Sequence, residues 1–296
     1  MASPLALTAE ALLRRVEWTV LRPLDGQLQG DYRTLFTGAG LDFRELREYV
    51  PGDDLRRIDW NVTARMDAPY VRQYAEDREL TAWFVLDRSG SMRFGPQGRG
   101  KEEVLIEFTA TLARLLTRGG NRIGALLSDG GRPAPVPSGS GRLHVLRLVH
   151  RLQQPHATAP VPTDLAALLA ASSGMILQRS LVVVVSDFIA APGWDRPLRL
   201  LAQRHDLVPV QIVDPLETTL PDVGEIVLED AETGERVLVD TADAGFRARL
   251  RALADAEQAQ VRDRVRACGL DLTTISTADD LVAVFLRLAA RRKVRR

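Results

Sequence analysis

Residues 81–92, TAWFVLDRSGSM, change abruptly from an apolar run to an aspartate and two serines. The apolar residues 82–86 are bounded by turn signals, which predicts a short strand buried in the middle of a parallel sheet. Asp87, Ser89 and Ser91 follow that strand directly. Because ligands bind at the carboxyl ends of strands in open α/β sheets, these side chains are expected at a binding or reaction site.

The same three side chains offer a set of oxygen donors on one tight turn. Asp87 is anionic, whereas Ser89 and Ser91 are neutral. Hard divalent cations prefer oxygen ligands, and Mg²⁺ in particular keeps several waters when it binds protein. The turn is therefore a candidate site for such a cation.

From residue 81 onward, predicted strands alternate with predicted helices. The run at 181–185 is the most strand-like of the chain and ends in Ser186 and Asp187. Prolines confine the strand at 132–137 to a sheet edge, because proline cannot donate to the ladder. The alternation predicts an α/β fold with a mostly parallel sheet covered by helices on both faces. Other expected strands are 122–127, 207–213 and 270–275, and expected helices are 101–116, 142–152, 165–177, 196–203, 244–267 and 279–291.

Three parts are predicted along the chain. Residues 1–29 form an N-terminal helical segment with a break or kink at Pro23. Residues 30–79 are rich in turns and form a small β-rich module, with a strand at residues 70–74. Residues 80–292 form the α/β domain, which carries a hairpin insertion near 222–240.

Side chains from three segments are expected to meet at one edge of the sheet. If the strands at 82–86 and 181–185 are neighbours, their ends bring Asp87, Ser89, Ser91 and Asp187 together, and Thr163 enters from the loop before a helix. This ordered set resembles the metal-ion-dependent adhesion site of von Willebrand factor type A domains. The resemblance implies that all five residues surround one ion, Mg²⁺ or another divalent cation such as Mn²⁺ or Ca²⁺. Asp187 is expected to act through a water.

Two longer stretches resemble a bacterial family. GLDFRELREYVPGDDLRRIDWNVTAR (residues 40–65) and DPLETTLPDVGEIVLEDAETGERVLVD (residues 214–240) are similar to the domain of unknown function 58 family, whose members carry a von Willebrand factor A-like domain. The resemblance implies partnership with a MoxR-type AAA+ ATPase, as an adaptor or accessory factor in the remodelling or maturation of a client protein.

The expected function is a non-enzymatic, metal-dependent protein-interaction module. Neutral hydroxyl ligands leave the ion electrophilic, so an open coordination position would favour a carboxylate of the ATPase or of the client. Two alternatives remain open. One is a magnesium-dependent hydrolase that uses the same site. The other is a metal-free scaffold, in which Asp87 and Asp187 end strands while the serines satisfy a turn.

Other motifs give weaker signals. A phosphatase of the haloacid dehalogenase kind needs a second aspartate where Ser89 stands. GPQGRGKE (residues 95–102) fits a phosphate loop except that Glu102 replaces the required serine or threonine, so it is interpreted as a flexible connection into a helix.

The mixed charges of a further cluster suit either structural ion pairs or a docking face: Asp53, Asp54, Arg56, Arg57, Asp59 and Trp60.

The composition of the chain bears on which partners it binds and on its location in the cell. The formal net charge is zero, so no global field attracts nucleic acid, and no nucleic-acid partner is expected. Cys268 is the sole cysteine, which favours a reducing compartment over a disulfide framework. No apolar run is long enough for a membrane span, and a cytoplasmic location is expected.

Overall fold

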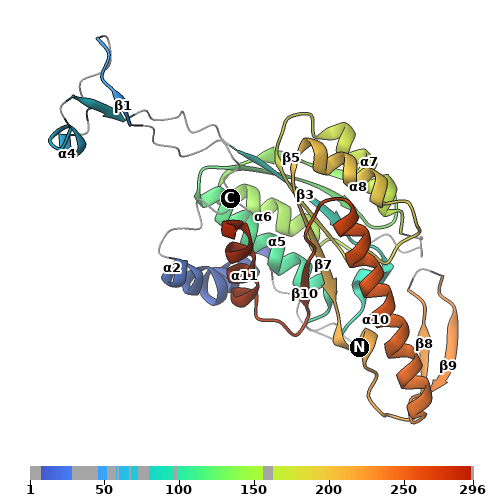
Figure 1. The fold of residues 1–296 in the computed structure, drawn as a ribbon. Helices are drawn as coiled ribbons and strands as arrows, with labels where there is room; N and C mark the ends of the chain where they lie inside the picture. The colour runs from blue at the N-terminus through green and yellow to red at the C-terminus, as the bar shows by residue number, and fades with distance from the viewer. Residues whose placement is uncertain are drawn as a thin grey trace.

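A six-stranded sheet forms the centre of the protein. The computed structural model describes residues 8–28, 46–51, 58, 60–66, 68–72, 80–96, 99–155, 163–231 and 233–294 (Figure 1). The strand order is β10-β7-β6-β3-β4-β5, and every pairing is parallel except that of the edge strand β5 with β4. The strands are β3 (Thr81–Asp87), β4 (Arg122–Ser128), β5 (Ala134–Gly139), β6 (Leu181–Ser186), β7 (Asp206–Val213) and β10 (Thr273–Ser276).

The sequence places β3 and β6 at the centre of this sheet. All six residues of β6, LVVVVS, are buried, as a strand covered on both faces requires. From β3 the chain adds β4 and β5 on one side and then returns to β6 on the other. The strand order therefore reverses between β3 and β6, which is where α/β sheets bind ligands.

Helices cover both faces of the sheet and enclose two hydrophobic cores. Alternate β3 residues point to opposite faces: Phe84 belongs to one core and Val85 to the other. The predicted α/β fold is thus confirmed. The first core is covered by α5 (Lys101–Arg118), α6 (Gly141–Leu152) and α11 (Leu281–Val294), and the second by α7 (Leu165–Met175), α8 (Asp195–Arg204) and α10 (Ala244–Ala267).

The N-terminal helix packs into the first core. It consists of α1 (Ala9–Val16), a π-helical turn η1 (Glu17–Leu21) and α2 (Arg22–Leu28). Pro23 lacks an N–H, and the widened turn immediately before it marks the interruption predicted at this proline. Leu13 and Leu24 are fully buried in the core.

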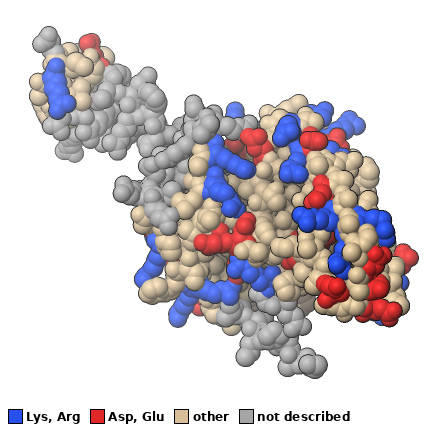
Figure 2. Space-filling view, turned by 60° about the horizontal axis from the view of Figure 1, so that its bottom comes forward, with Lys and Arg blue, Asp and Glu red and all other residues tan. Residues whose placement is uncertain are grey.

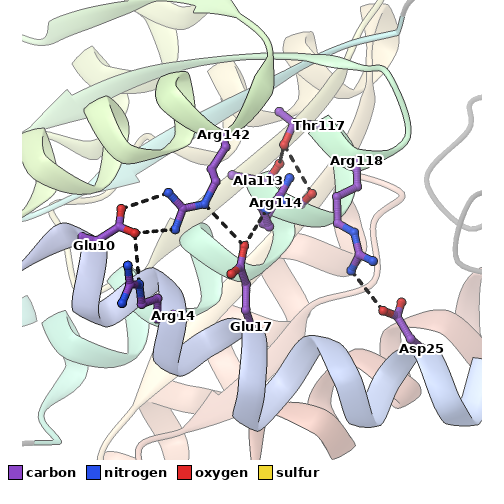
Figure 3. Close-up of polar contacts among 9 residues, drawn as sticks. All are labelled: Glu10, Arg14, Glu17, Asp25, Ala113, Arg114, Thr117, Arg118 and Arg142. Carbon is purple, nitrogen blue, oxygen red and sulfur yellow. Dashed lines mark hydrogen bonds and ion pairs between the residues drawn. The ribbon is translucent and has the colours of Figure 1, made fainter.

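Ion pairs fasten this helix to its neighbours, as Figure 3 shows. Glu10 accepts hydrogen bonds from both terminal nitrogens of Arg142, at 2.7 and 2.9 Å, and this lowers the pKa of Glu10. Further along the helix, two pairs reach α5: Glu17 with Arg114 at 2.9 Å, and Asp25 with Arg118 at 3.0 Å.

A small unit precedes the sheet. Strand β1 (Leu46–Glu48) pairs antiparallel with β2 (Tyr70–Arg72), and the short helix α4 (Trp60–Thr63) lies between them in sequence. The Tyr70 amide donates to Thr63 Oγ1 at 3.0 Å, which ties β2 to α4. The strand predicted at 70–74 is confirmed over Tyr70–Arg72, and residues 73 and 74 lie outside the described residues. Of the charged cluster, Asp53, Asp54, Arg56, Arg57 and Asp59 lie outside the described residues, and the three domain boundaries stay predictions.

The insertion after β7 contains the predicted hairpin. It begins with α9 (Pro215–Thr218), followed by β8 (Glu225–Glu229) and β9 (Arg236–Asp240), which pair antiparallel. The hairpin lies within the range predicted for the insertion, and Gly234 of its turn has a φ of 73°, which glycine adopts without strain. Among the helices that the structure describes, none has the length and apolarity to cross a bilayer.

Candidate functional site

The turn after β3 brings three predicted ligands together. We call residues 87–91 the metal loop. Its Ser89 amide donates to Asp87 Oδ1 at 3.0 Å, and the hydroxyls of Ser89 and Ser91 lie 3.1 Å apart. Asp87 and Ser89 are buried, while Ser91 is partly exposed. Three oxygen-bearing side chains therefore share one turn, with Ser91 on its solvent side.

The end of β6 lies next to this loop. The Ser186 hydroxyl donates to Asp87 Oδ2 at 2.6 Å and so joins the two central strands at their carboxyl ends. The same hydroxyl accepts a hydrogen bond from the Phe188 amide at 2.8 Å. Sequence reasoning did not include Ser186 in the site, although its place at the end of the most apolar strand was a usable signal.

Asp187 is held by contacts on both of its carboxylate oxygens. Oδ1 accepts from the Ile189 amide at 3.0 Å, and Oδ2 accepts from Lys101 Nζ at 2.8 Å. The next residue, Phe188, has a φ of 61°, a left-handed conformation that costs a non-glycine residue about 1–3 kcal/mol. Its ring packs edge-on against Trp194, with centroids 5.2 Å apart, and this packing holds the strained turn.

Lys101 is a second residue of the site that sequence reasoning missed. Its ammonium group lies between the carboxylates of Asp187 and Glu217 and is fully buried. Burial lowers the pKa of Lys101, but the two carboxylates raise it more, so the net pKa is above the ordinary value. A signal was present in the sequence, because Lys101 is one of only two lysines in a chain rich in arginine.

Asp87 carries the main electrostatic cost of the site. Desolvation by burial, and then the nearby charge of Asp187, raise the pKa of Asp87 to about 6, against the opposing hydrogen bonds from Ser186 and Ser89. Lys101 bonds Asp187, whereas the hydrogen bonds to Asp87 come from neutral donors. A cation beside Asp87 would therefore relieve this cost.

Arg88 anchors the metal loop to its surroundings. Its backbone amide donates to the Ser128 carbonyl at 2.6 Å. Its side chain bonds Glu102 at 2.9 Å and the Gln154 carbonyl at 2.9 Å. Glu102 stands where a phosphate loop would require serine or threonine. In the structure it instead connects the metal loop to α5 through Arg88.

Thr163 comes from a separate element. It is buried and directly precedes Asp164, whose side chain caps α7 by accepting from the Ala167 amide at 2.8 Å. Helix α7 packs against β3 and β4. The structure brings Asp87, Ser89 and Ser91 onto one loop with Asp187 beside it. That Thr163 completes the set stays a prediction.

The donor set fits a hard divalent cation. Asp87 would supply a charged oxygen ligand to such an ion. Ser89 and Ser91 would supply neutral oxygens, whereas Asp187, bonded on both oxygens, suits an outer position through water. Within the described residues, no group of three or more His, Cys, Asp or Glu side chains could hold a metal. A metal at this rim would therefore depend on hydroxyls.

Comparisons with known proteins agree with this architecture. The uncharacterized protein Rv1480 of Mycobacterium tuberculosis is 39% identical over 284 residues, which cover 96% of this chain and 89% of that protein. The solved structure of an aerotolerance-related membrane protein from Bacteroides fragilis covers 73% of this chain and 99% of its own, with 12% identity and a TM-score of 0.50. This likeness shows a shared fold.

A further solved structure that is similar to this chain is described as a vWF domain. The vWF domain of the type V pili tip protein Mfa5 from Porphyromonas gingivalis has 12% identity and a TM-score of 0.40, and it covers 73% of this chain and 95% of its own. The family model "Protein of unknown function DUF58" matches residues 45–260. The chain therefore belongs to the DUF58 family.

Proposed function

We propose that this protein is a non-enzymatic, metal-dependent interaction module. Asp87, Ser89 and Ser91 would hold Mg²⁺ or a similar divalent cation directly. Thr163 and Asp187 would complete its surroundings, with Asp187 acting through water. A carboxylate of a partner protein would fill the remaining coordination position.

The observation that carries this proposal is the environment of Asp87. A buried carboxylate whose pKa is raised to about 6 by desolvation and by Asp187 has an unfavourable charge at neutral pH. A dication within coordination distance favours the ionised form and would offset that cost. Its remaining ligands are neutral hydroxyls, so the ion would keep enough positive charge to attract a further carboxylate.

We further propose that the partner is a MoxR-type AAA+ ATPase or its client, with this chain as an adaptor or accessory factor. Support for this comes from the resemblance of residues 40–65 and 214–240 to the family. The ammonium group of Lys101 is paired with the carboxylates of Asp187 and Glu217, an arrangement that does not suit binding of a nucleotide phosphate by this lysine. Nucleotide chemistry would then belong to the ATPase.

The distribution of charge favours a protein partner over nucleic acid. On the face shown in Figure 2, the basic and acidic side chains of the described residues are interspersed. The formal net charge of the whole chain is zero. Binding to a phosphate backbone depends on concentrated positive charge, which this face does not provide.

One observation favours a second candidate, the metal-free scaffold. Lys101 already supplies a cation to Asp187, at 2.8 Å. In this alternative, Lys101 neutralises the rim by itself, and Asp87 is protonated near its raised pKa. The scaffold would present the same loops without an ion, and chelators would leave its interactions unchanged.

A pull-down separates the two candidates. The immobilised protein is incubated with a purified MoxR-type ATPase from the same source, with Mg²⁺ or with chelator. We expect retention with Mg²⁺ and its loss with chelator or in Ser89→Ala. Ser140→Ala is the matched control, because Ser140 is exposed and its side chain does not cap α6. Retention that survives chelator and Ser89→Ala would favour the scaffold.

A further inference from the structure

We propose that the β8–β9 hairpin is a strap that closes over the metal loop, and that a partner reaches the loop only when the hairpin tip moves away. The tip comprises residues 230–231 and 233–235, between the two strands. This inference rests on the proposed function for its biological meaning, but the closure itself is a property of the fold. Three sets of contacts carry it, at the tip, within the turn and at the base.

The tip lies directly against the metal loop. A methyl group placed on Gly90 would overlap the backbone carbonyl oxygen of Ala231. The metal loop and the hairpin tip therefore approach each other as closely as glycine permits. Gly90 does not have a positive φ, and its need for glycine comes from this close approach. Gly90 lies between Ser89 and Ser91, so the tip contacts the metal loop between its two serines.

Hydrogen bonds within the turn give the tip a defined shape. The Asp230 amide donates to the Glu235 carbonyl, and the Gly234 amide to the Asp230 carbonyl, both at 2.8 Å. The Asp230 side chain accepts from the Thr233 amide at 2.8 Å. A turn whose backbone groups pair internally can move as one body, because no hydrogen bond of the turn itself has to break.

The base of the hairpin is fixed. Buried Thr241 donates to the Gly224 carbonyl at 2.7 Å and accepts from the Val223 amide at 3.0 Å, which closes the two strands. Arg247 of α10 bonds the Thr241 carbonyl. At the start of the insertion, Glu217 shares Lys101 with Asp187. The insertion is thus tied to the site through α9, the hairpin is closed at its base by Thr241, and its tip contacts the metal loop.

The outer face of the hairpin has few contacts to oppose such a movement. Val227 and Leu238 form a directly opposed pair, and they are 59% and 64% exposed. Between the fixed base and the tip, this face is open to solvent. Movement of the hairpin would therefore expose little apolar surface that is now buried on that side. Figure 1 shows the hairpin lying alongside α10.

A shortened hairpin tests the strap without altering the metal loop. Because Glu229 and Arg236 are directly paired, residues 230–235 can be replaced by Asn-Gly, which suits a two-residue hairpin turn. Hydrogen exchange followed by mass spectrometry then compares residues 88–94 with the wild type. We expect exchange there to be faster by about tenfold or more, because the cover is gone. Glu235→Gln is the control, since it changes tip charge and keeps the Ala231 carbonyl.

Gly90→Ala provides a second test from the other side of the contact. The added methyl should push the tip away and speed exchange in residues 229–236, while the thermal melt shows that the protein remains folded. Unchanged exchange in residues 88–94 of the shortened variant would overturn the strap. So would unchanged exchange of the tip in folded Gly90→Ala.

Mn²⁺ separates this inference from the proposed function. Relaxation of water protons per bound Mn²⁺ should rise in the shortened variant, because more waters reach the ion. If exchange increases but neither protein binds Mn²⁺, the strap is supported and the metal-dependent function fails. If both bind Mn²⁺ and exchange stays the same, the metal site is supported and the strap fails.

Discussion

The ammonium nitrogen of Lys101 lies 2.8 Å from Asp187 Oδ2, and both side chains are buried at the rim of the central sheet. The two residues are 86 positions apart in the sequence. Their pairing joins the first residue of α5 to the loop after β6, next to the metal loop. Asp187 is thereby held in place whether or not an ion is present.

Breaking this pair should be costly. In Lys101→Met, the carboxylate of Asp187 stays buried without its cation, and removal of one partner from a buried pair costs about 3–5 kcal/mol. Urea unfolding at neutral pH measures the loss. The control is Arg236→Met, because the Arg236–Glu229 pair is 69% and 52% exposed and should contribute only about 0–1 kcal/mol. Equal effects of the two substitutions would contradict the described burial of Lys101.

The stability of the metal-free protein should fall as pH rises through about 6. The pKa of Asp87 is raised from 3.8 to about 6 by burial and by Asp187, so between these values the folded state binds more protons than the unfolded state. The contribution of Asp87 is fully present below pH 3.8 and is lost above 6, a loss of about 3 kcal/mol.

Urea unfolding in chelator, at several pH values, checks this. Asp87→Asn should remove that part of the slope, because Asn cannot ionise. Its Oδ1 can still accept from the Ser89 amide, while its Nδ2 would donate to Ser186 Oγ in place of the present bond from the Ser186 hydroxyl. Saturating Mg²⁺ should also flatten the slope, since it favours ionised Asp87. A slope that is identical in wild type and Asp87→Asn would show that Asp87 is not the group responsible.

The N-terminal helix should be part of the folding unit of the α/β domain. Leu13 is fully buried in the core that α5 and α11 share, so Leu13→Ala should cost about 2–5 kcal/mol. Leu253→Ala makes the same chemical change at a side chain that is 70% exposed, and its effect should be within about 0.5 kcal/mol. If Leu13→Ala were as mild as Leu253→Ala, the helix would fold independently of the sheet.

Much of the fold could be predicted because its signals are local. The helical pattern of 244–267 coincides with α10, and the apolar run at 181–185 corresponds to β6. The metal loop was recognisable because its three oxygen-bearing residues lie within five positions of a buried strand. Such patterns arise from the 3.6-residue and two-residue periodicities, which a single segment displays by itself.

The contacts that complete the site could not be predicted in this way. Lys101 meets Asp187, and Ser186 meets Asp87, only because particular strands and helices become neighbours in the fold. The approach of Ala231 to Gly90 likewise depends on the length and direction of the hairpin. Local periodicity carries no information about which side chains meet across elements.

The most direct test of the account is a crystal grown or soaked with Mn²⁺ and measured near the manganese absorption edge. We expect an anomalous peak at coordination distance, about 2 Å, from oxygens of Asp87, Ser89 and Ser91, with Asp187 linked through water. The peak should vanish in Asp87→Ala. At saturating Mn²⁺, no peak at the metal loop of a folded wild-type protein, or a peak that persists in Asp87→Ala, would contradict the proposed metal-dependent role.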